Sequence, residues 1–373
     1  MHILFIEPSG AGGVSHCTYA LARALGEQGA RCDIITATRW LDRPLPDSVR
    51  VHRVFNALRT NPLRVWAACR SFRRQADIVH WQCSTYPRLV LAVMRIIPLQ
   101  RIPWVYTVHN VLPHEIQKSS LALYEKTYKR MQGLIFHTNH SRRIFEQQFP
   151  HIRKPHAVIP LGEYGFLLGG KTAGASSSPP PVILFFGNIR PYKGLDILIR
   201  AMPEIRRKVP HARLLIAGQA LGPFEECEKL IHEFHLQSCV ETRFGYIPDE
   251  EIPALLDSAA VAALPYRDID QSAALMLMMA YGKAIAAARV GGIPEVIRDG
   301  ETGRLVPPND PQALAQAVSA LLLDPAAARR LGGQARQDAQ TRFSWPHIAG
   351  ETIRFYNQLI KKDSIEKNDE QHS

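Results

Sequence analysis

Short runs of apolar residues alternate with helix-length segments along the first half of the chain. The runs are HILFIE (2–7), CDIITA (32–37), DIVHW (77–81), WVYTVH (104–109) and GLIFHT (133–138). Continuous apolar runs of this length are typical of strands that are buried on both faces. With a helical segment such as 14–28 between them, they predict a doubly wound parallel sheet.

The alternation begins again after residues 169–181, whose sequence GGKTAGASSSPPP predicts a linker or a surface loop. Further apolar runs predict a second α/β unit and lie at 182–187, 213–218, 240–245, 261–266, 284–288 and 303–307. A last helix is expected over 345–362, and the polar tail 363–373 is expected to be disordered.

Length and composition place the chain among globular proteins. Its 373 residues suit two domains, and 46% hydrophobic with 21% charged residues exclude global disorder. No apolar run reaches the roughly 18 residues of a spanning helix, and the start lacks a signal-peptide pattern. We therefore expect a cytoplasmic location.

The net charge of +11 is concentrated in the first half, where residues 1–165 hold 22 Lys and Arg but only 10 Asp and Glu. Such an excess attracts nucleic acid, anionic lipid or an anionic substrate. One stretch has basic residues around Trp66, which suits either a helix at a membrane surface or a solvated face over ordinary core contacts. These basic residues are Arg59, Arg64, Arg70, Arg73 and Arg74.

The cysteines and histidines give no metal-binding pattern in the sequence. Six cysteines are scattered without a CxxC pair, which predicts reduced and mostly buried thiols. His137 and His140 are three residues apart, but no further cysteine or carboxylate lies near them in the sequence. We therefore predict a structural histidine pair and no metal site.

Glycines follow the first strand at Gly10, Gly12 and Gly13 and precede a helix, where backbone N–H groups favour phosphate. The pattern resembles a dinucleotide-binding loop but has Ser15 in place of the third glycine. The second strand also lacks the acid that binds a ribose, so nicotinamide binding is disfavoured. The loop is either a ligand-cleft wall or a plain turn.

Other candidate residues follow later strands, at the sheet edge where α/β proteins bind ligands. Arg190 and Lys193 suit a diphosphate, although a solvated loop would hold the same cations. His109 would orient a sugar hydroxyl or act on a proton, or it is structural.

In PYRDIDQSAAL (265–275), Asp268 or Asp270 would accept sugar hydroxyls, and the N–H groups from Ser272 onward would meet phosphate. A plain helix cap uses the same residue types. In RVGGIPE (289–295), Glu295 would bind a hydroxyl, or the segment is a turn before a helix.

Together these segments resemble the retaining glycosyltransferases of family 4, which have the GT-B fold. The resemblance is strongest over 182–308 and rests on GNIRPYKGLDILI, RLLIAG, FGYIPDEEI, ALPYRDIDQSAAL, ARVGGIPEVI and DGETGRLVPPNDP in the order of the family. It is weaker over 1–165, in PSGAGGVSHCTYALARAL and TVHNVLPHE.

The resemblance implies two Rossmann-like domains that face a central cleft. The acceptor side would be 1–165, the linker 166–181 and the nucleotide-sugar domain 182–344. The helix 345–362 would cross back to the first domain.

The resemblance also assigns roles to residues. Arg190 and Lys193 would bind the donor diphosphate, and His109 would lie beside the transferred sugar. The other implied donor-binding residues are Gly12, Gly13, Tyr246, Ile247, Asp270, Gln271, Ser272, Ala273 and Glu295. No cofactor or metal is expected beside the nucleotide-diphosphate sugar.

The sequence departs from the family where a second glutamate is usual, because Leu277 occupies that position. Ala273 also stands where glycine is usual. Two functions stay open: transfer of a hexose-type sugar, and a degenerate scaffold or binding subunit. For the enzyme we expect a lipid-linked glycan acceptor of cell-surface polysaccharide assembly, at the inner membrane face. Nucleic-acid binding is disfavoured because no recognised module is present.

Overall fold

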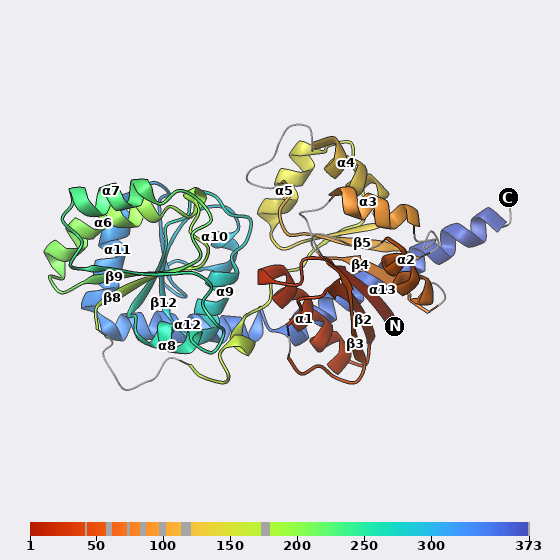
Figure 1. The fold of residues 1–373 in the computed structure, drawn as a ribbon, viewed down its shortest axis with the longest axis horizontal. Coiled ribbons are helices and arrows are strands. Elements are labelled where there is room, and N and C mark those ends of the chain that lie inside the picture. Colours follow the sequence, from red (N-terminus) through yellow and green to blue (C-terminus); the bar gives the residue numbers. More distant parts are fainter. Residues whose placement is uncertain are drawn as a thin grey trace. The chain divides into compact units, whose positions relative to one another are not determined.

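The structure is a computed structural model that describes residues 1–41, 43–56, 62–72, 75–82, 87–96, 102–112, 121–172 and 180–371. The chain forms two compact units (Figure 1). Unit 1 combines Met1–Gly162 with Trp345–Ser373, whereas unit 2 is the continuous stretch Glu163–Ser344. Both are α/β units with parallel sheets, so the predicted fold class is confirmed.

Unit 1 contains a seven-stranded parallel sheet in the order β3-β2-β1-β4-β5-β6-β7. The strands are β1 (His2–Glu7), β2 (Arg31–Ala37), β3 (Val49–Phe55), β4 (Ile78–Trp81), β5 (Trp104–Val108), β6 (Gly133–Phe136) and β7 (His156–Val158). The helices are α1 (Gly12–Glu27), α2 (Pro62–Phe72), α3 (Pro87–Ile96), α4 (Leu121–Arg130), α5 (Asn139–Gln148) and α13 (Trp345–Gln371). One core forms between the sheet and α2 to α5, while α1 packs against α13.

The two edge strands of unit 1, β3 and β7, are absent from the strands expected from the sequence. The residues of β3, VRVHRVF, alternate between apolar and polar, and those of β7 are only three. Edge strands are half-exposed, so they do not produce the continuous apolar run that marks a central strand. All five expected runs of the first half correspond to the inner strands β1, β2, β4, β5 and β6.

Unit 2 contains a six-stranded parallel sheet in the order β10-β9-β8-β11-β12-β13. The strands are β8 (Val182–Phe186), β9 (Arg213–Gly218), β10 (Val240–Phe244), β11 (Val261–Leu264), β12 (Ala284–Ala288) and β13 (Arg304–Val306). The helices are α6 (Leu195–Lys208), α7 (Glu225–Glu233), α8 (Ile252–Asp257), α9 (Ala273–Tyr281), α10 (Ile293–Val296), α11 (Pro311–Leu323) and α12 (Pro325–Thr341). Figure 1 shows helices on both faces of this sheet, and one core lies between the strands and α6, α7 and α11.

The boundaries differ in two places from those expected. Unit 2 begins at Glu163, and a short 3-10 helix at Gly165–Leu167 packs on α9, so the start of the expected linker 166–181 belongs to unit 2. Buried Leu167 and Leu168 explain this, because their side chains join the apolar interior. The expected linker residues 173–179 lie outside the described residues.

The C-terminal helix is longer than expected. The sequence predicts a helix over 345–362 and a disordered tail over 363–373, but α13 continues to Gln371. The prediction of disorder was based on the polar composition of 363–373, whereas the backbone is helical as far as Gln371.

Candidate functional site

The strand order of unit 2 reverses at β8, which pairs with β9 on one side and β11 on the other. In open α/β sheets, ligands bind beyond the carboxyl ends of the strands at such a reversal. Two loops leave the sheet there, 187–194 after β8 and 265–272 after β11. Both contain residues that the sequence singled out.

Lys193 is the most unusual residue of these loops because its side chain is buried, with only 8% of its surface exposed. The ammonium donates a hydrogen bond to the Tyr266 hydroxyl at 3.0 Å and lies 4.1 Å from the centroid of the same ring. Among the described residues, no carboxylate pairs with this ammonium. A buried cation without an acidic partner is costly, and a bound anion would offset that cost.

The two loops are fastened to each other by Arg267. Its guanidinium binds both carboxylate oxygens of Asp196, at 2.7 and 2.6 Å, and also donates to the carbonyl of Pro191 at 3.0 Å. Its backbone N–H donates to the carbonyl of Tyr192 at 2.8 Å. Burial alone would raise the pKa of Asp196, but the hydrogen bond and charge of Arg267 lower it. The loop of Lys193 is thereby positioned before any ligand binds.

Gly194 permits this close approach. Its φ is +66°, and a Cβ at this position would lie 2.0 Å from the carbonyl oxygen of Pro265. Only glycine satisfies both the left-handed backbone and the contact between the loops. Arg190 lies at the other end of the short 3-10 turn and is half-buried.

The loop after β11 ends in the N-terminus of α9. The Ser272 hydroxyl accepts a hydrogen bond from the N–H of Leu275 at 3.2 Å and lies 3.3 Å from the Tyr266 hydroxyl. Ser272 is therefore the helix cap, the alternative that the sequence left open. Ala273 begins the helix, and the first N–H groups of a helix attract anions. Asp270 is buried and Gln271 is half-buried in the same loop.

Two further segments follow other strands of the same sheet. Gly291 has a φ of +55°, and a Cβ there would lie 1.6 Å from the carbonyl oxygen of Ile269. This close packing joins the segment after β12 to the loop after β11, and Glu295 lies four residues further on, in the short helix α10. Tyr246 and Ile247 follow β10, and Tyr246 is 73% exposed.

Leu277 lies inside α9 and is only 2% exposed. The position at which family 4 usually has its second glutamate is therefore part of the core of unit 2. This position offers no polar contact to a ligand.

In unit 1, the first loop is organised by Glu7 at the end of β1. Its buried carboxylate accepts hydrogen bonds from the N–H of Gly10 at 2.8 Å, from the N–H of Ser9 at 3.1 Å and from the Thr36 hydroxyl at 3.1 Å. Burial raises the pKa of Glu7 although these bonds lower it. The loop leads to Gly12 and Gly13, which are exposed at the N-terminus of α1.

His109, directly after β5, belongs to a buried hydrogen-bond network. Its Nε2–H donates to Gln82 Oε1 at 3.0 Å, and Gln82 Nε2 lies 3.4 Å from His80 Nε2. His80 also contacts the Thr107 hydroxyl at 2.7 Å and, through Nδ1, the Tyr356 hydroxyl at 2.5 Å. Burial and the nearby His137 and His80 hold the pKa of His109 well below its usual value. His109 is therefore neutral at pH 7, which favours orienting a hydroxyl over donating a proton from an imidazolium.

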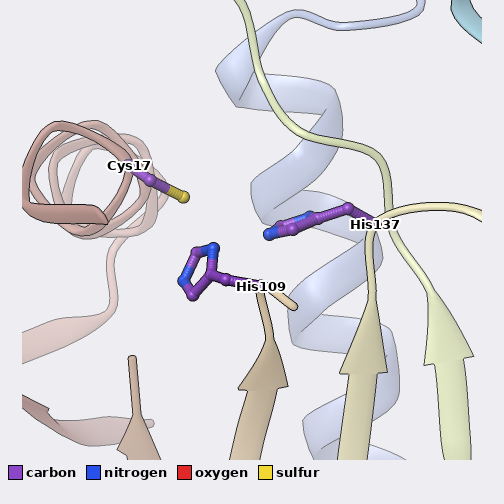
Figure 2. Close-up of side chains that lie close together, drawn as sticks. All are labelled: Cys17, His109 and His137. Atoms are coloured by element: carbon purple, nitrogen blue, oxygen red, sulfur yellow. The ribbon is translucent and has the colours of Figure 1, made fainter. Parts of the chain in front are cut away.

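The structure also brings His109 together with Cys17 of α1 and His137 at the end of β6 (Figure 2). One side-chain nitrogen or sulfur of each residue lies within 4.8 Å of those of the other two, and all three residues are buried. The sequence predicted a structural pair of His137 with His140 and no metal site. That pairing missed the cluster because Cys17, His109 and His137 come from three separate segments.

The predicted site residues thus form two groups. Unit 2 holds most of them in the loops after β8 and β11 at its strand reversal: Arg190, Lys193, Asp270, Gln271, Ser272 and Ala273. Glu295 follows β12, and Tyr246 and Ile247 follow β10, which lies two strands from β8. Unit 1 holds Gly12, Gly13 and His109. The sequence missed Glu7, Gln82 and Tyr266, because each lies in or beside an apolar run that looks like ordinary strand sequence.

Other predictions have separate outcomes. The cysteines among the described residues are all free and buried, as expected, while Cys83 lies outside them. In the basic stretch, Arg70 lies over the Trp66 ring at 4.7 Å, and Arg59, Arg73 and Arg74 lie outside the described residues. No described helix is long and apolar enough to cross a membrane.

Two family models match the chain. The model described as "Glycosyltransferase Family 4" matches residues 11–162, and "Glycosyl transferases group 1" matches residues 180–324. Among curated relatives, the MMP alpha-(1->4)-mannosyltransferase of Mycolicibacterium hassiacum is 37% identical over 174 residues, or 46% of this chain and 41% of that protein. The chain thus matches less than half the length of this relative.

Solved structures share the fold over almost the whole chain. Sucrose-phosphate synthase from Thermosynechococcus elongatus has a TM-score of 0.77 at 22% identity and covers 97% of this chain and 100% of its own. HepE of Anabaena, solved in complex with UDP, has a TM-score of 0.75 at 21% identity and covers 96% of this chain and 100% of its own.

Proposed function

Since this chain belongs to glycosyltransferase family 4, we propose that it transfers a hexose-type sugar from a nucleoside-diphosphate donor to an acceptor hydroxyl. The observation that carries the proposal is the buried ammonium of Lys193, which lies at the strand reversal of unit 2 without a carboxylate partner among the described residues. A donor diphosphate supplies the missing negative charge.

The chemistry of the transfer explains why this charge matters. When the bond between the sugar and the diphosphate breaks, negative charge accumulates on the leaving phosphate oxygens. Lys193, Arg190 and the first N–H groups of α9 would stabilise that charge without reorganisation, because Arg267 and Gly194 already fix their loop. The proposal includes retention of configuration, with the acceptor attacking on the side of the leaving phosphate.

The remaining predicted residues receive supporting roles in the proposal. Tyr246 and Ile247 would contact the base, and Glu295 would contact the ribose. In unit 1, the neutral His109 would orient a sugar hydroxyl, and the exposed Gly12 and Gly13 would line the sugar-phosphate side.

The names of related proteins support a guanine or uracil donor. One curated relative, from Mycolicibacterium smegmatis, is named a GDP-mannose-dependent mannosyltransferase, and the HepE structure contains UDP. For the acceptor we propose a lipid-linked glycan intermediate at a membrane surface. The charge excess in residues 1–165 supports an anionic carrier of this kind.

Calorimetric titration of the full chain with UDP and GDP tests the diphosphate site. We expect saturable binding of one of them, about 10- to 100-fold weaker in Lys193→Met, because charge-assisted hydrogen bonds contribute about 1.5–3 kcal/mol. The matched control is Lys229→Met, which removes an exposed lysine of α7. If Lys193→Met keeps the circular dichroism spectrum of the wild type and binds the nucleotide equally well, the proposed diphosphate site is wrong.

The buried Leu277 favours a second candidate, a binding subunit that no longer catalyses transfer. Incubation with the sugar donor that binds discriminates between the two. Release of nucleoside diphosphate, lost in Arg190→Ala, supports the enzyme. Tight donor binding with no release, in the presence of glycan acceptors, supports the binding subunit.

A further inference from the structure

The cluster of Cys17, His109 and His137 is not required by the diphosphate site of unit 2. Cys17 lies in the second turn of α1, while the two histidines follow β5 and β6 at the carboxyl edge of the sheet. Figure 2 shows the two imidazoles pointing toward each other and toward the Cys17 sulfur. Their ring centroids lie 5.0 Å apart.

The hydrogen bonds of both imidazoles define which nitrogen faces the cluster. His137 Nδ1–H donates to the carbonyl of Ile159 at 2.9 Å, and His109 Nε2–H donates to Gln82 Oε1 at 3.0 Å. The other nitrogen of each ring, Nε2 of His137 and Nδ1 of His109, therefore carries a lone pair. Histidines that bind metals almost always donate their second N–H to such an acceptor.

The surroundings of His137 Nε2 also point to a bound cation. This atom is completely buried and, among the described residues, has no hydrogen-bond partner. A buried acceptor without a partner is costly. A cation at the centre of the cluster would satisfy this lone pair.

We propose that Cys17 Sγ, His109 Nδ1 and His137 Nε2 form a binding site for a divalent metal ion of the zinc class. One thiolate and two imidazoles match the preference of Zn²⁺ for sulfur and nitrogen ligands, and three protein ligands leave a fourth position open. Binding releases one proton, from the Cys17 thiol, and both imidazoles stay neutral. The metal keeps its oxidation state.

The present distances are slightly longer than those of a loaded site. Zn–S bonds of about 2.3 Å and Zn–N bonds of about 2.0 Å place tetrahedral ligand atoms roughly 3.3–3.6 Å apart. Because the ligand atoms already lie within 4.8 Å of one another, shifts of at most about 0.8 Å for each side chain close the site. The thiol, whose pKa burial raises to about 12, is deprotonated by coordination to the metal.

A consequence follows that rests on the proposed function. A metal ion bound to His109 prevents this residue from contacting the sugar, so we expect Zn²⁺ in the site to inhibit sugar transfer. The metal site itself depends only on unit 1, so its failure and the failure of the diphosphate site are measured separately.

Cobalt titration of the purified full chain tests the site, because Co²⁺ replaces Zn²⁺ and gives a near-ultraviolet band when a thiolate binds it. We expect one equivalent of Co²⁺ to produce this band and one equivalent of Zn²⁺ to remove it. Cys17→Ser should lose the band, and His137→Asn should bind at least about tenfold more weakly. Two controls should keep the band: Cys69→Ser, at another buried cysteine of unit 1, and His140→Asn.

Tryptophan emission shows whether each variant is folded, because all five tryptophans of the chain belong to unit 1. Folded wild-type protein without the band at excess Co²⁺ overturns the proposal, and so does a band that persists in folded Cys17→Ser. If Cys17→Ser does not fold, the Co²⁺ affinities of His137→Asn and His140→Asn decide the question. Equal Co²⁺ affinity in these two variants also overturns the proposal.

Discussion

A lysine ammonium is costly to bury, because water no longer solvates its charge. Lys193 is 8% exposed, and a hydroxyl and an aromatic ring are weaker partners than a carboxylate. At the scale of single residues, this imbalance distinguishes Lys193 from an ordinary surface cation. The exposed Arg207, by contrast, forms an ion pair with Glu204 and needs no ligand.

The close approach of the Lys193 loop to the loop after β11 depends on Gly194. In Gly194→Ala, the new methyl group would lie 2.0 Å from the Pro265 carbonyl oxygen at a φ of +66°, so the loops must separate. We expect unit 2 to lose about 2 kcal/mol or more of unfolding free energy and nucleotide affinity to fall at least about tenfold.

Urea unfolding followed by circular dichroism measures the stability, and tryptophan emission reports unit 1 as an internal reference. Gly333→Ala in α12 is the matched control, since a Cβ there has no neighbour within 4 Å. It should stabilise unit 2 by about 0.5–1 kcal/mol. Equal effects of the two substitutions would show that the contact between the loops is unimportant.

At the scale of elements, a buried polar network connects β4, β5 and α13. His80 of β4 contacts Thr107 of β5 and Tyr356 of α13, and Gln82 extends the network to His109. The network fixes the tautomer of His109 and therefore which nitrogen faces Cys17. It also explains why polar residues interrupt the apolar runs of the central strands.

Burial of His80 makes the stability of unit 1 depend on pH. Burial lowers the pKa of His80 to about 3, whereas an unfolded histidine titrates near 6.5. Between these values the unfolded chain binds a proton that the native protein does not, so stability falls as the pH decreases below about 6.5. The expected slope from His80 is about 1.4 kcal/mol per pH unit.

Urea unfolding of unit 1 between pH 7 and pH 5, followed by tryptophan emission, measures this slope. His80→Gln removes the titrating group and should make the slope shallower by one proton, even though its stability at pH 7 is lower. The same slope in wild type and variant would mean that His80 does not stay neutral in the native protein.

At the scale of the whole molecule, unit 1 is built from both ends of the chain and unit 2 from the continuous stretch between them. The helix α13 buries Trp345, Ile348, Phe355, Tyr356 and Leu359. Glycines at Gly133 and Gly162 leave space for this helix, because a Cβ there would lie 2.5 Å from Leu359 and Trp345, respectively. The strands of unit 1 therefore depend on a helix that follows the whole of unit 2 in the sequence.

Ending the chain after Ser344 should consequently destabilise unit 1 but not unit 2. We expect the tryptophan transition of unit 1 to lose its cooperativity or shift to lower urea, while unit 2 keeps its own transition by circular dichroism. Ending the chain after Lys362 is the control and should change neither transition. An unchanged tryptophan midpoint after removal of all of α13 would contradict this dependence.

The candidate site was predictable where its residues follow buried strands. His109 comes directly after an apolar run, and Arg190, Lys193 and Asp270 lie in the loops that follow such runs. The carboxyl ends of parallel strands share one edge of a sheet. Tyr266 and Glu7 were not predictable in the same way. The role of each depends on which loop the fold brings beside it, and this cannot be inferred from the identity of its neighbours in the sequence.

The sequence by itself determined the alternation of strands and helices and the division into two α/β units, because burial on both faces leaves a continuous apolar signature. Its ordered motifs, not this signature, indicated the resemblance to family 4. Only the tertiary structure decided which polar groups meet. Cys17, His109 and His137 converge from three segments, and Lys193 is buried because Arg267 draws two loops together. Contacts of this kind depend on distances across the fold, whereas the sequence pattern reports only what each segment buries.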